Sequence, residues 1–339
     1  MRTTAVEPGE VLPTRLLHPV LDTYLSAPVG ITGCHSYGIA RACCEYDVVI
    51  VSKEPAPRST MVMGESYIDL FFPSEKDVLG PSDPELAVSL AQLKPVRDSS
   101  LIFSTSSAAA RAVLHENLKK SAEGRLAKSL KSLGRADAAL SKGALVDADF
   151  WLLSSAHEFA FAWLYLGGTK PAPSHLLEQL RAHSAESPGS YEAFSRAAGL
   201  EKASKSSCGE RLESLSVVYD AVNAKARDAE GTGADTSRAA FEIVRAKAGF
   251  MNQAMMHADC YAFLGLEVCS ALSQISEIRA GELGEKLDPS QIVTFLSEGE
   301  RRMLGGSIVT GLGLTREKES MGKGIDGLRA EISGLAKDI

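Results

Sequence analysis

The hydrophobic and polar positions follow two different patterns on either side of residue 105. Before it, short runs of β-branched and aromatic residues predict strands, whereas after it apolar residues recur at helical spacing. The predicted strands cover residues 45–52, 61–63, 67–72 and 94–104, and predicted helices cover 15–26 and 84–93. Residues 53–60, which contain two prolines, predict a turn or loop.

The remainder of the chain lacks any convincing strand pattern. Helices are predicted at 106–142 (one or two), 145–166, from Ser174 onward, 189–199, 209–226, 236–281, 289–303 and 323–337. The long 236–281 segment is expected to break near Gly249 or Gly265, and 305–313 is expected to be a loop. The predicted fold class is α+β, with a small mixed-sheet domain at 1–105 and an all-α helical bundle region at 106–339. A further division near 228–235 is left open.

Composition narrows the classes of function. The 339 residues carry a formal net charge of −7, which does not favour a nucleic-acid partner. None of the six cysteines forms a Cys-x-x-Cys pair, and no apolar run is long enough to span a membrane. No signal peptide is visible. We therefore expect a cytoplasmic protein with reduced thiols, and the sequence leaves a homo-oligomer open.

The segment 29–51 holds the strongest candidate chemistry. An apolar stretch ends in a glycine turn, and a buried strand then begins behind two acids, Glu45 and Asp47. Residues two apart in a strand point the same way, so the two carboxylates share one space and repel each other unless a cation lies between them. Asp69, inside the apolar run 67–72, also needs a partner. Acids beside glycines that expose backbone N–H groups indicate metal-dependent nucleotide chemistry.

These residues resemble the signature of the DNA-polymerase-β-like nucleotidyltransferase superfamily and its minimal members. Gly33-Cys34 stands where that family has Gly-Ser, Gly38 matches the later glycine, and Glu45-Tyr46-Asp47 matches the Asp-x-Asp that opens a strand. Asp69 resembles the third carboxylate, on a neighbouring strand. The resemblance implies that Mg²⁺ or Mn²⁺ is held by Glu45, Asp47 and Asp69, that NTP is bound by Gly33, Cys34 and Gly38, and that Asp69 is also the general base.

The helical region carries a second resemblance. Residues 150–162, followed by Pro-Ser-His-Leu-Leu-Glu ending at Glu178, are similar to a HEPN-type bundle or the helical half of kanamycin-nucleotidyltransferase-like proteins. Ribonuclease activity is not predicted, because Arg111 and His115 are too close for the HEPN Arg–His motif. His157 is interpreted as a hydrogen-bonded core histidine.

Several charged or polar groups near the glycine turn are interpreted as ordinary surface residues. We expect His35 to face solvent, and we expect Lys53 and Arg58 to be solvated, with steering of an anionic nucleotide as the alternative.

The favoured function is therefore a Mg-dependent nucleotidyltransferase. It would move a nucleoside monophosphate from an NTP to a hydroxyl of an unidentified small-molecule or protein acceptor chosen by the helical region. Because Glu45 and Cys34 depart from the family pattern, the alternative is a catalytically weakened nucleotide-binding or partner-binding module of toxin–antitoxin type. A third alternative is a helical interaction protein with a small α/β appendage.

Overall fold

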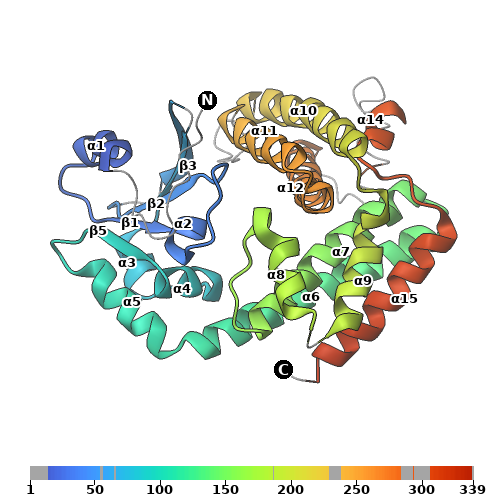
Figure 1. Cartoon of the computed structure of the whole chain (residues 1–339), viewed down its shortest axis with the longest axis horizontal. Coiled ribbons are helices and arrows are strands. Elements are labelled where there is room, and N and C mark those ends of the chain that lie inside the picture. Colours follow the sequence, from blue (N-terminus) through green and yellow to red (C-terminus); the bar gives the residue numbers. More distant parts are fainter. Residues whose placement is uncertain are drawn as a thin grey trace. The chain divides into compact units, whose positions relative to one another are not determined.

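A computed structural model of the chain describes residues 14–53, 56–64, 66–185, 187–228, 238–283, 293 and 306–337. It divides into two compact units, residues 1–120 and 121–339. The first contains a sheet and short helices, and the second is built from helices (Figure 1). The predicted α+β class, with a small mixed sheet followed by a helical region, is confirmed.

The first unit is organised around a five-stranded sheet in the order β3-β4-β2-β1-β5. Strands β2 and β4 pair in parallel, whereas the other pairs are antiparallel, so the sheet is mixed. Strands β3 and β4 form a hairpin around Gly64, whose φ of 64° suits a glycine turn. The strand bounds are β1 Val29–Thr32, β2 Tyr46–Ile50, β3 Ala56–Met63, β4 Ser66–Phe72 and β5 Lys94–Arg97.

Helices cover both faces of this sheet. Alternate residues of β2 point to opposite sides, so Val48 packs in one core with α1 (Thr14–Thr23). Val49 packs in another core with α4 (Pro84–Ala91) and α5 (Ile102–Ala112). The short helix α2 (Gly33–Tyr37) connects β1 to β2 and packs against both strands. The helices on the Val49 side of the sheet are α3 Glu75–Leu79, α4 Pro84–Ala91 and α5 Ile102–Ala112.

Two sequence predictions in this unit are wrong. The expected loop at 53–60 is largely strand, because β3 begins at Ala56 and its place at the sheet edge tolerates Pro57. The expected strand at 94–104 stops at Arg97. Asp98 then accepts hydrogen bonds from the backbone N–H groups of Phe103 (3.0 Å) and Ser104 (2.8 Å), which satisfies the start of α5.

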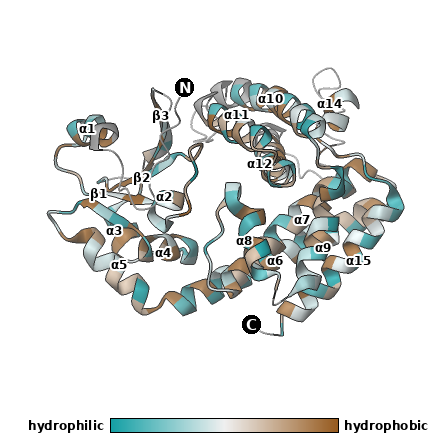
Figure 2. Cartoon of the chain, in the orientation of Figure 1, coloured by the Kyte–Doolittle hydropathy of each residue, from teal (hydrophilic) through white to brown (hydrophobic). Residues whose placement is uncertain are grey.

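The second unit contains no strand among its described residues. Helix α7 (Leu145–Leu166) matches its predicted range and is buried almost throughout, because several other helices pack against it. Brown and teal alternate along α10, α11 and α12 in Figure 2, as expected for amphipathic helices. The other bounds are α6 Leu114–Ser141, η1 Pro173–His175, α8 Leu176–His183, α9 Pro188–Ala198, η2 Leu200–Lys202, α10 Lys205–Asp228, α11 Arg238–Gln253, α12 His257–Leu283, α14 Gly306–Gly311 and α15 Lys318–Leu335.

Two predictions for the helical region are also wrong. The 236–281 segment breaks at residues 254–256, where Met255 has a φ of 57°, and not at a glycine. Gly265 stays within α12, where its missing side chain leaves room for Arg211. The expected loop at 305–313 contains α14. The predicted helix at 289–303 lies outside the described residues except for Val293, and most of the proposed division at 228–235 does too.

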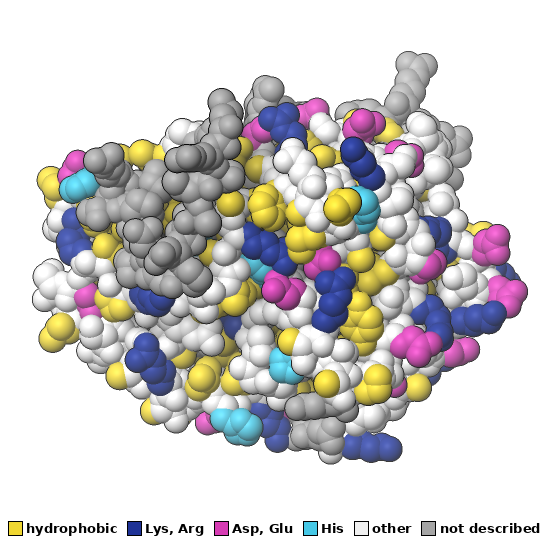
Figure 3. Space-filling view, in the orientation of Figure 1, with side chains coloured by type: hydrophobic (Ala, Val, Ile, Leu, Met, Phe, Trp, Pro, Cys, Tyr) yellow, Lys and Arg dark blue, Asp and Glu magenta, His cyan; other side chains and the backbone are white. Residues whose placement is uncertain are grey.

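Exposed charges of both signs are interspersed over the described part of the face drawn in Figure 3. Within the ranges that the structure describes, no helix combines the length and apolar character needed to cross a bilayer.

Candidate functional site

A row of four polar residues crosses the sheet of the first unit. Asp47 on β2 pairs with Thr32 on β1 and with Asp69 on β4, and Asp69 pairs with Thr60 on β3. Residues paired across neighbouring strands point to the same face. The structure therefore places Asp47 and Asp69 side by side on one face of the sheet.

The Asp47 carboxylate lies directly against the glycine turn. Gly33 has a φ of 71°, and a Cβ added to it would come within 1.8 Å of Asp47 Oδ2. Only a residue without a side chain leaves room for the carboxylate and adopts this φ without strain. The structure thus brings the predicted glycine and the predicted acid into direct contact.

Arg58 connects the two acids. Its guanidinium forms an ion pair with Asp69 Oδ2, and its Nη2 lies 3.7 Å from Asp47 Oδ1. The Thr60 hydroxyl adds a contact of 3.5 Å to Asp69 Oδ1. The Asp69 side chain is only 7% exposed, whereas that of Arg58 is 43% exposed. The interpretation of Arg58 as a solvated loop charge is wrong.

Arg58 reaches Asp69 because of the local backbone. The β3–β4 register shifts between Ala56 and Ser59, so the strand carries one extra residue there. Arg58 lies within the shifted stretch, and both it and Thr60, two residues further on, contact Asp69. The period-two Arg58-x-Thr60 pattern was the signal in the sequence, but it is informative only once residues 56–63 are recognised as a strand.

Glu45, the third predicted ligand, precedes β2 and is partly buried. Among the described residues, the carboxylates of Glu45, Asp47 and Asp69 do not all approach within 4.8 Å of one another. The structure places Asp47 and Asp69 in register on neighbouring strands, and the three carboxylates do not form one tight group.

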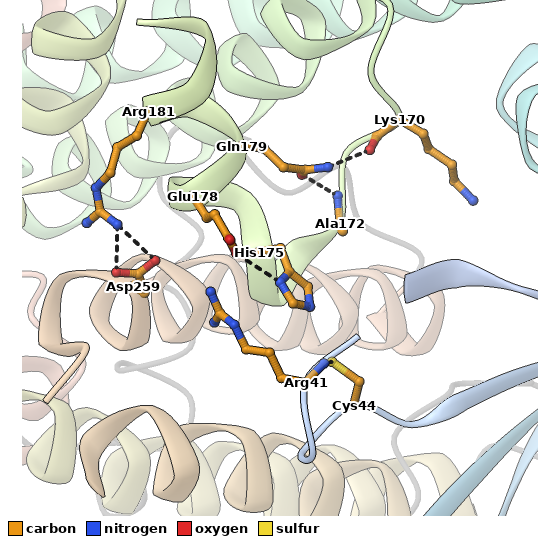
Figure 4. A network of polar contacts seen from close by, with 9 residues as sticks. All are labelled: Arg41, Cys44, Lys170, Ala172, His175, Glu178, Gln179, Arg181 and Asp259. Atoms are coloured by element: carbon orange, nitrogen blue, oxygen red, sulfur yellow. Dashed lines mark hydrogen bonds and ion pairs between the residues drawn. The ribbon is translucent and has the colours of Figure 1, made fainter. Parts of the chain in front are cut away.

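Cys34 is buried beside these acids as a neutral thiol. A hydrogen bond with Cys44, burial, and the charges of Asp47 and Glu45 raise the pKa of the Cys34 thiol far above its ordinary value. The backbone N–H of Arg41 donates to Cys44 Sγ at 3.3 Å, a contact drawn in Figure 4. The Cys34 thiol therefore lies beside the Cys44 thiol, behind the turn.

Gly38, the later predicted glycine, ends α2 in the left-handed conformation with a φ of 75°. A Cβ at this position would meet nothing within 4 Å, so a glycine is favoured there by the backbone conformation and not by lack of space. His35, on the same helix, stacks on Tyr46 with ring centroids 3.8 Å apart, which corrects the expectation that it faces solvent.

In the second unit, both ring nitrogens of His157 have hydrogen-bond partners. His157 is fully buried, with its ring nitrogens 2.9 Å from the Leu153 carbonyl and 3.0 Å from that of Ala262, as expected for a core histidine. Burial holds the pKa of His157 below its ordinary value, and the nearby Arg211 charge acts in the same direction.

A polar network lies around α8, as Figure 4 shows. Arg181 Nη1 contacts both oxygens of the buried Asp259 at 3.1 and 3.2 Å, and His175 Nδ1 lies 3.2 Å from Glu178. The Gln179 side chain donates to the Lys170 carbonyl at 2.9 Å. These contacts fix α8 against α12 and the preceding turn.

Comparisons with known proteins add little to this geometry. No protein-family model matches the chain, and no curated protein matches it either. One solved structure with a detectable similarity is a nucleotidyltransferase-like protein from Exiguobacterium sibiricum 255-15, with 12% identity and a TM-score of 0.33 over 84% of this chain and 90% of that one. At that TM-score, the functional argument rests on the site itself.

Proposed function

We propose that this protein is a divalent-metal-dependent nucleotidyltransferase that moves a nucleoside monophosphate from an NTP to a hydroxyl of an acceptor. The observation that carries the proposal is the Asp47–Asp69 pair, in register on neighbouring parallel strands, with Gly33 held against Asp47. Pyrophosphate is the leaving group, and the acceptor is a small molecule or a protein.

The residues present fit a divalent cation. Two carboxylates share one face, and a guanidinium already provides them with positive charge. Carboxylate oxygens are the ligands that Mg²⁺ and Mn²⁺ prefer. When bound, such ions offset the triphosphate charge and activate the attacking oxygen. In this proposal Asp47 and Asp69 are the ligands that the geometry supports best, and Glu45 stays a predicted third ligand.

The remaining roles follow from position. Asp69 is buried and held by Thr60, so it is oriented to accept the proton of the acceptor hydroxyl as general base. The backbone at Gly33 and Cys34 is the proposed cradle for the phosphates, with Gly38 shaping the end of the turn. The Thr32 hydroxyl, at the end of the polar row, is buried without a hydrogen-bond partner in the described structure, and a phosphate oxygen would satisfy it.

The helical unit is proposed to select the acceptor. Its likeness to HEPN-type or kanamycin-nucleotidyltransferase-like bundles stays a prediction, as do the cytoplasmic location and any homo-oligomer.

The alternative function is a nucleotide-binding module that has lost turnover. Two observations favour it: the Cys34 thiol pairs with Cys44, and the three predicted carboxylate ligands do not form one tight group. Such a module would bind NTP and report the bound state to a partner without transferring the nucleotide.

Transfer of label from α-³²P-NTP, with Mg²⁺ and separate small-molecule and protein fractions of a lysate as acceptors, tests the proposal. We expect labelled product from the wild type and a loss of about 100-fold or more in Asp47→Asn and Asp69→Asn, because each substitution removes a charged metal ligand. Glu75→Gln removes an exposed acid of the same unit and serves as the matched control.

Calorimetric titration with each Mg·NTP distinguishes the two candidates. Binding without product in any fraction supports the non-catalytic module. Absence of both binding and product contradicts both functions.

A further inference from the structure

Arg58 occupies the position that a bound cation would need. Its guanidinium contacts Asp69 Oδ2 and approaches Asp47 Oδ1. These oxygens belong to the two carboxylates proposed as metal ligands. A guanidinium and a divalent ion therefore compete for the same lone pairs, and both cannot hold them at once.

The side chain of Arg58 belongs to neither hydrophobic core of the unit. It is 43% exposed, it extends from the edge strand β3, and it lies within the register shift of that strand. It can leave the acids by rotating toward water, without opening either hydrophobic core of the unit. Asp69, at 7% exposure, cannot follow it into water, so the departure of Arg58 takes a positive partner away from a buried charge. The pair therefore suits an exchange of one cation for another.

The charge that would draw Arg58 away is a triphosphate. A guanidinium binds phosphate oxygens with the same paired N–H geometry that it uses for a carboxylate. A metal ion that arrives alone has to displace Arg58 into water. A metal ion that arrives on a triphosphate brings a second anion that accepts the displaced guanidinium.

We propose that Arg58 is an internal counter-ion that keeps Asp47 and Asp69 closed to free divalent metal and transfers to the phosphates when a metal–nucleoside triphosphate complex binds. This inference rests on the proposed function and adds a rule of binding to it. The site discriminates against free metal and takes the metal–triphosphate complex as its substrate. Arg58 then pairs with the metal ligands when no nucleotide is bound, and it binds the phosphates when the nucleotide complex is present.

Replacing Arg58 should change two affinities in opposite directions. We would titrate the full chain with Mn²⁺ alone, and then with Mn²⁺ plus the non-hydrolysable α,β-methylene ATP, following free Mn²⁺ by electron paramagnetic resonance and heat by calorimetry. For Arg58→Gln we expect Mn²⁺ alone to bind about 10-fold tighter or more, and the nucleotide complex to bind about 10-fold weaker or more. Arg58→Lys keeps the charge but loses the paired N–H groups of the guanidinium. Its affinities for Mn²⁺ and for the nucleotide complex should lie between those of Arg58→Gln and the wild type.

Lys94→Gln is the matched control. It removes one positive charge from an exposed position on β5, at the opposite edge of the same sheet, and should change neither affinity. Asp47→Asn should weaken Mn²⁺ binding whether or not Arg58 is present. Thermal unfolding of Arg58→Gln, with and without Mn²⁺, should show a lower Tm that the metal restores.

The outcomes separate the inference from the function on which it rests. Equal Mn²⁺ affinity in the wild type and Arg58→Gln, with a loss in Asp47→Asn, overturns the counter-ion role and leaves the metal site standing. A lower Tm in Arg58→Gln that Mn²⁺ does not restore, with both affinities unchanged, makes Arg58 purely structural and also overturns the inference. If neither protein binds Mn²⁺ or the nucleotide complex, the proposed function itself fails.

Discussion

Two of the aspartate–arginine pairs in the described part of the chain lie in sharply different surroundings. In the first unit, Asp69 meets an arginine that is 43% exposed and whose hydrogen bond goes to a carboxylate. In the second unit, Asp149 and Arg316 are 1% and 3% exposed. The Arg316 side chain donates to Asp149 and also to the carbonyls of Arg196 and Ala197, and its backbone N–H donates to Asp149 Oδ2 at 2.8 Å.

The difference separates a structural ion pair from an exchangeable one. Arg316 is anchored by carbonyls of α7 and α9 as well as by a carboxylate, so nothing can replace it without unfolding that region. Arg58 has solvent on one side and two acids on the other. An ion pair that a ligand displaces should be one whose loss costs the fold little stability. The following predictions test whether the two pairs differ in this way.

The largest effect is expected on removal of the buried negative charge. Asp149→Asn leaves Arg316 charged and buried, so the free energy of unfolding should fall by about 3 to 5 kcal/mol. Asp69→Asn should cost less, about 2 kcal/mol at most, because the half-exposed Arg58 regains water. Urea unfolding followed by circular dichroism measures both values. Equal losses would abolish the distinction between the two pairs.

The next effect concerns the glycine beneath Asp47. Gly33→Ala places a Cβ 1.8 Å from Asp47 Oδ2 at a φ of 71°, so we expect a loss of about 2 to 4 kcal/mol together with weaker Mn²⁺ binding. Gly64→Ala, at a φ of 64° with open space around it, controls for backbone strain alone and should cost about 1 kcal/mol. If the two variants lose the same stability and Mn²⁺ affinity is intact, Asp47 does not depend on the turn.

Titration of His157 should affect folding rather than binding. Its folded pKa is depressed by burial, so below the ordinary value of 6.5 the unfolded chain takes up a proton more readily than the folded one. Stability should therefore fall as the pH is lowered through 6.5 toward the depressed pKa, and should be constant above 6.5. His157→Gln removes this group, and chemical denaturation between pH 5 and pH 8 should then give a flatter profile. An unchanged pH slope in the variant would contradict the assignment.

The smallest effect is expected at an exposed pair. Arg329 Nη2 lies 2.7 Å from Asp137, but the two side chains are 49% and 52% exposed. Arg329→Gln should change the free energy of unfolding by less than about 1 kcal/mol, because water and salt screen such pairs. A loss as large as that of Asp149→Asn would show that exposure does not determine how much an ion pair contributes to the free energy of unfolding.

The sequence predicted elements with strong local signals and missed those that depend on tertiary partners. Helix α7 and the start of α4 at Pro84 follow from apolar periodicity and from capping residues. The sequence predicted the end of strand β3, residues 61–63, but missed its beginning at 56–60. A proline and polar residues are acceptable there only at a sheet edge, and no local pattern shows which strand will be an edge.

The same limit applies to the site. The spacing of Gly33 and Asp47 was visible in the sequence, but their contact depends on the register of β1 and β2. The role of Arg58 depends on the β3–β4 hairpin and its shift, so charge and position along the chain could not reveal it. The resemblance predicts a tight group of three acids. The structure places two of them, Asp47 and Asp69, side by side on neighbouring strands.

The most direct test is a crystal structure of the full chain with Mn²⁺ and α,β-methylene ATP, measured at the manganese absorption edge. We expect an anomalous peak at the carboxylates of Asp47 and Asp69, with the Arg58 guanidinium bound to the triphosphate. Manganese bound elsewhere, or Arg58 still paired with Asp69 beside a bound nucleotide, would contradict this expectation.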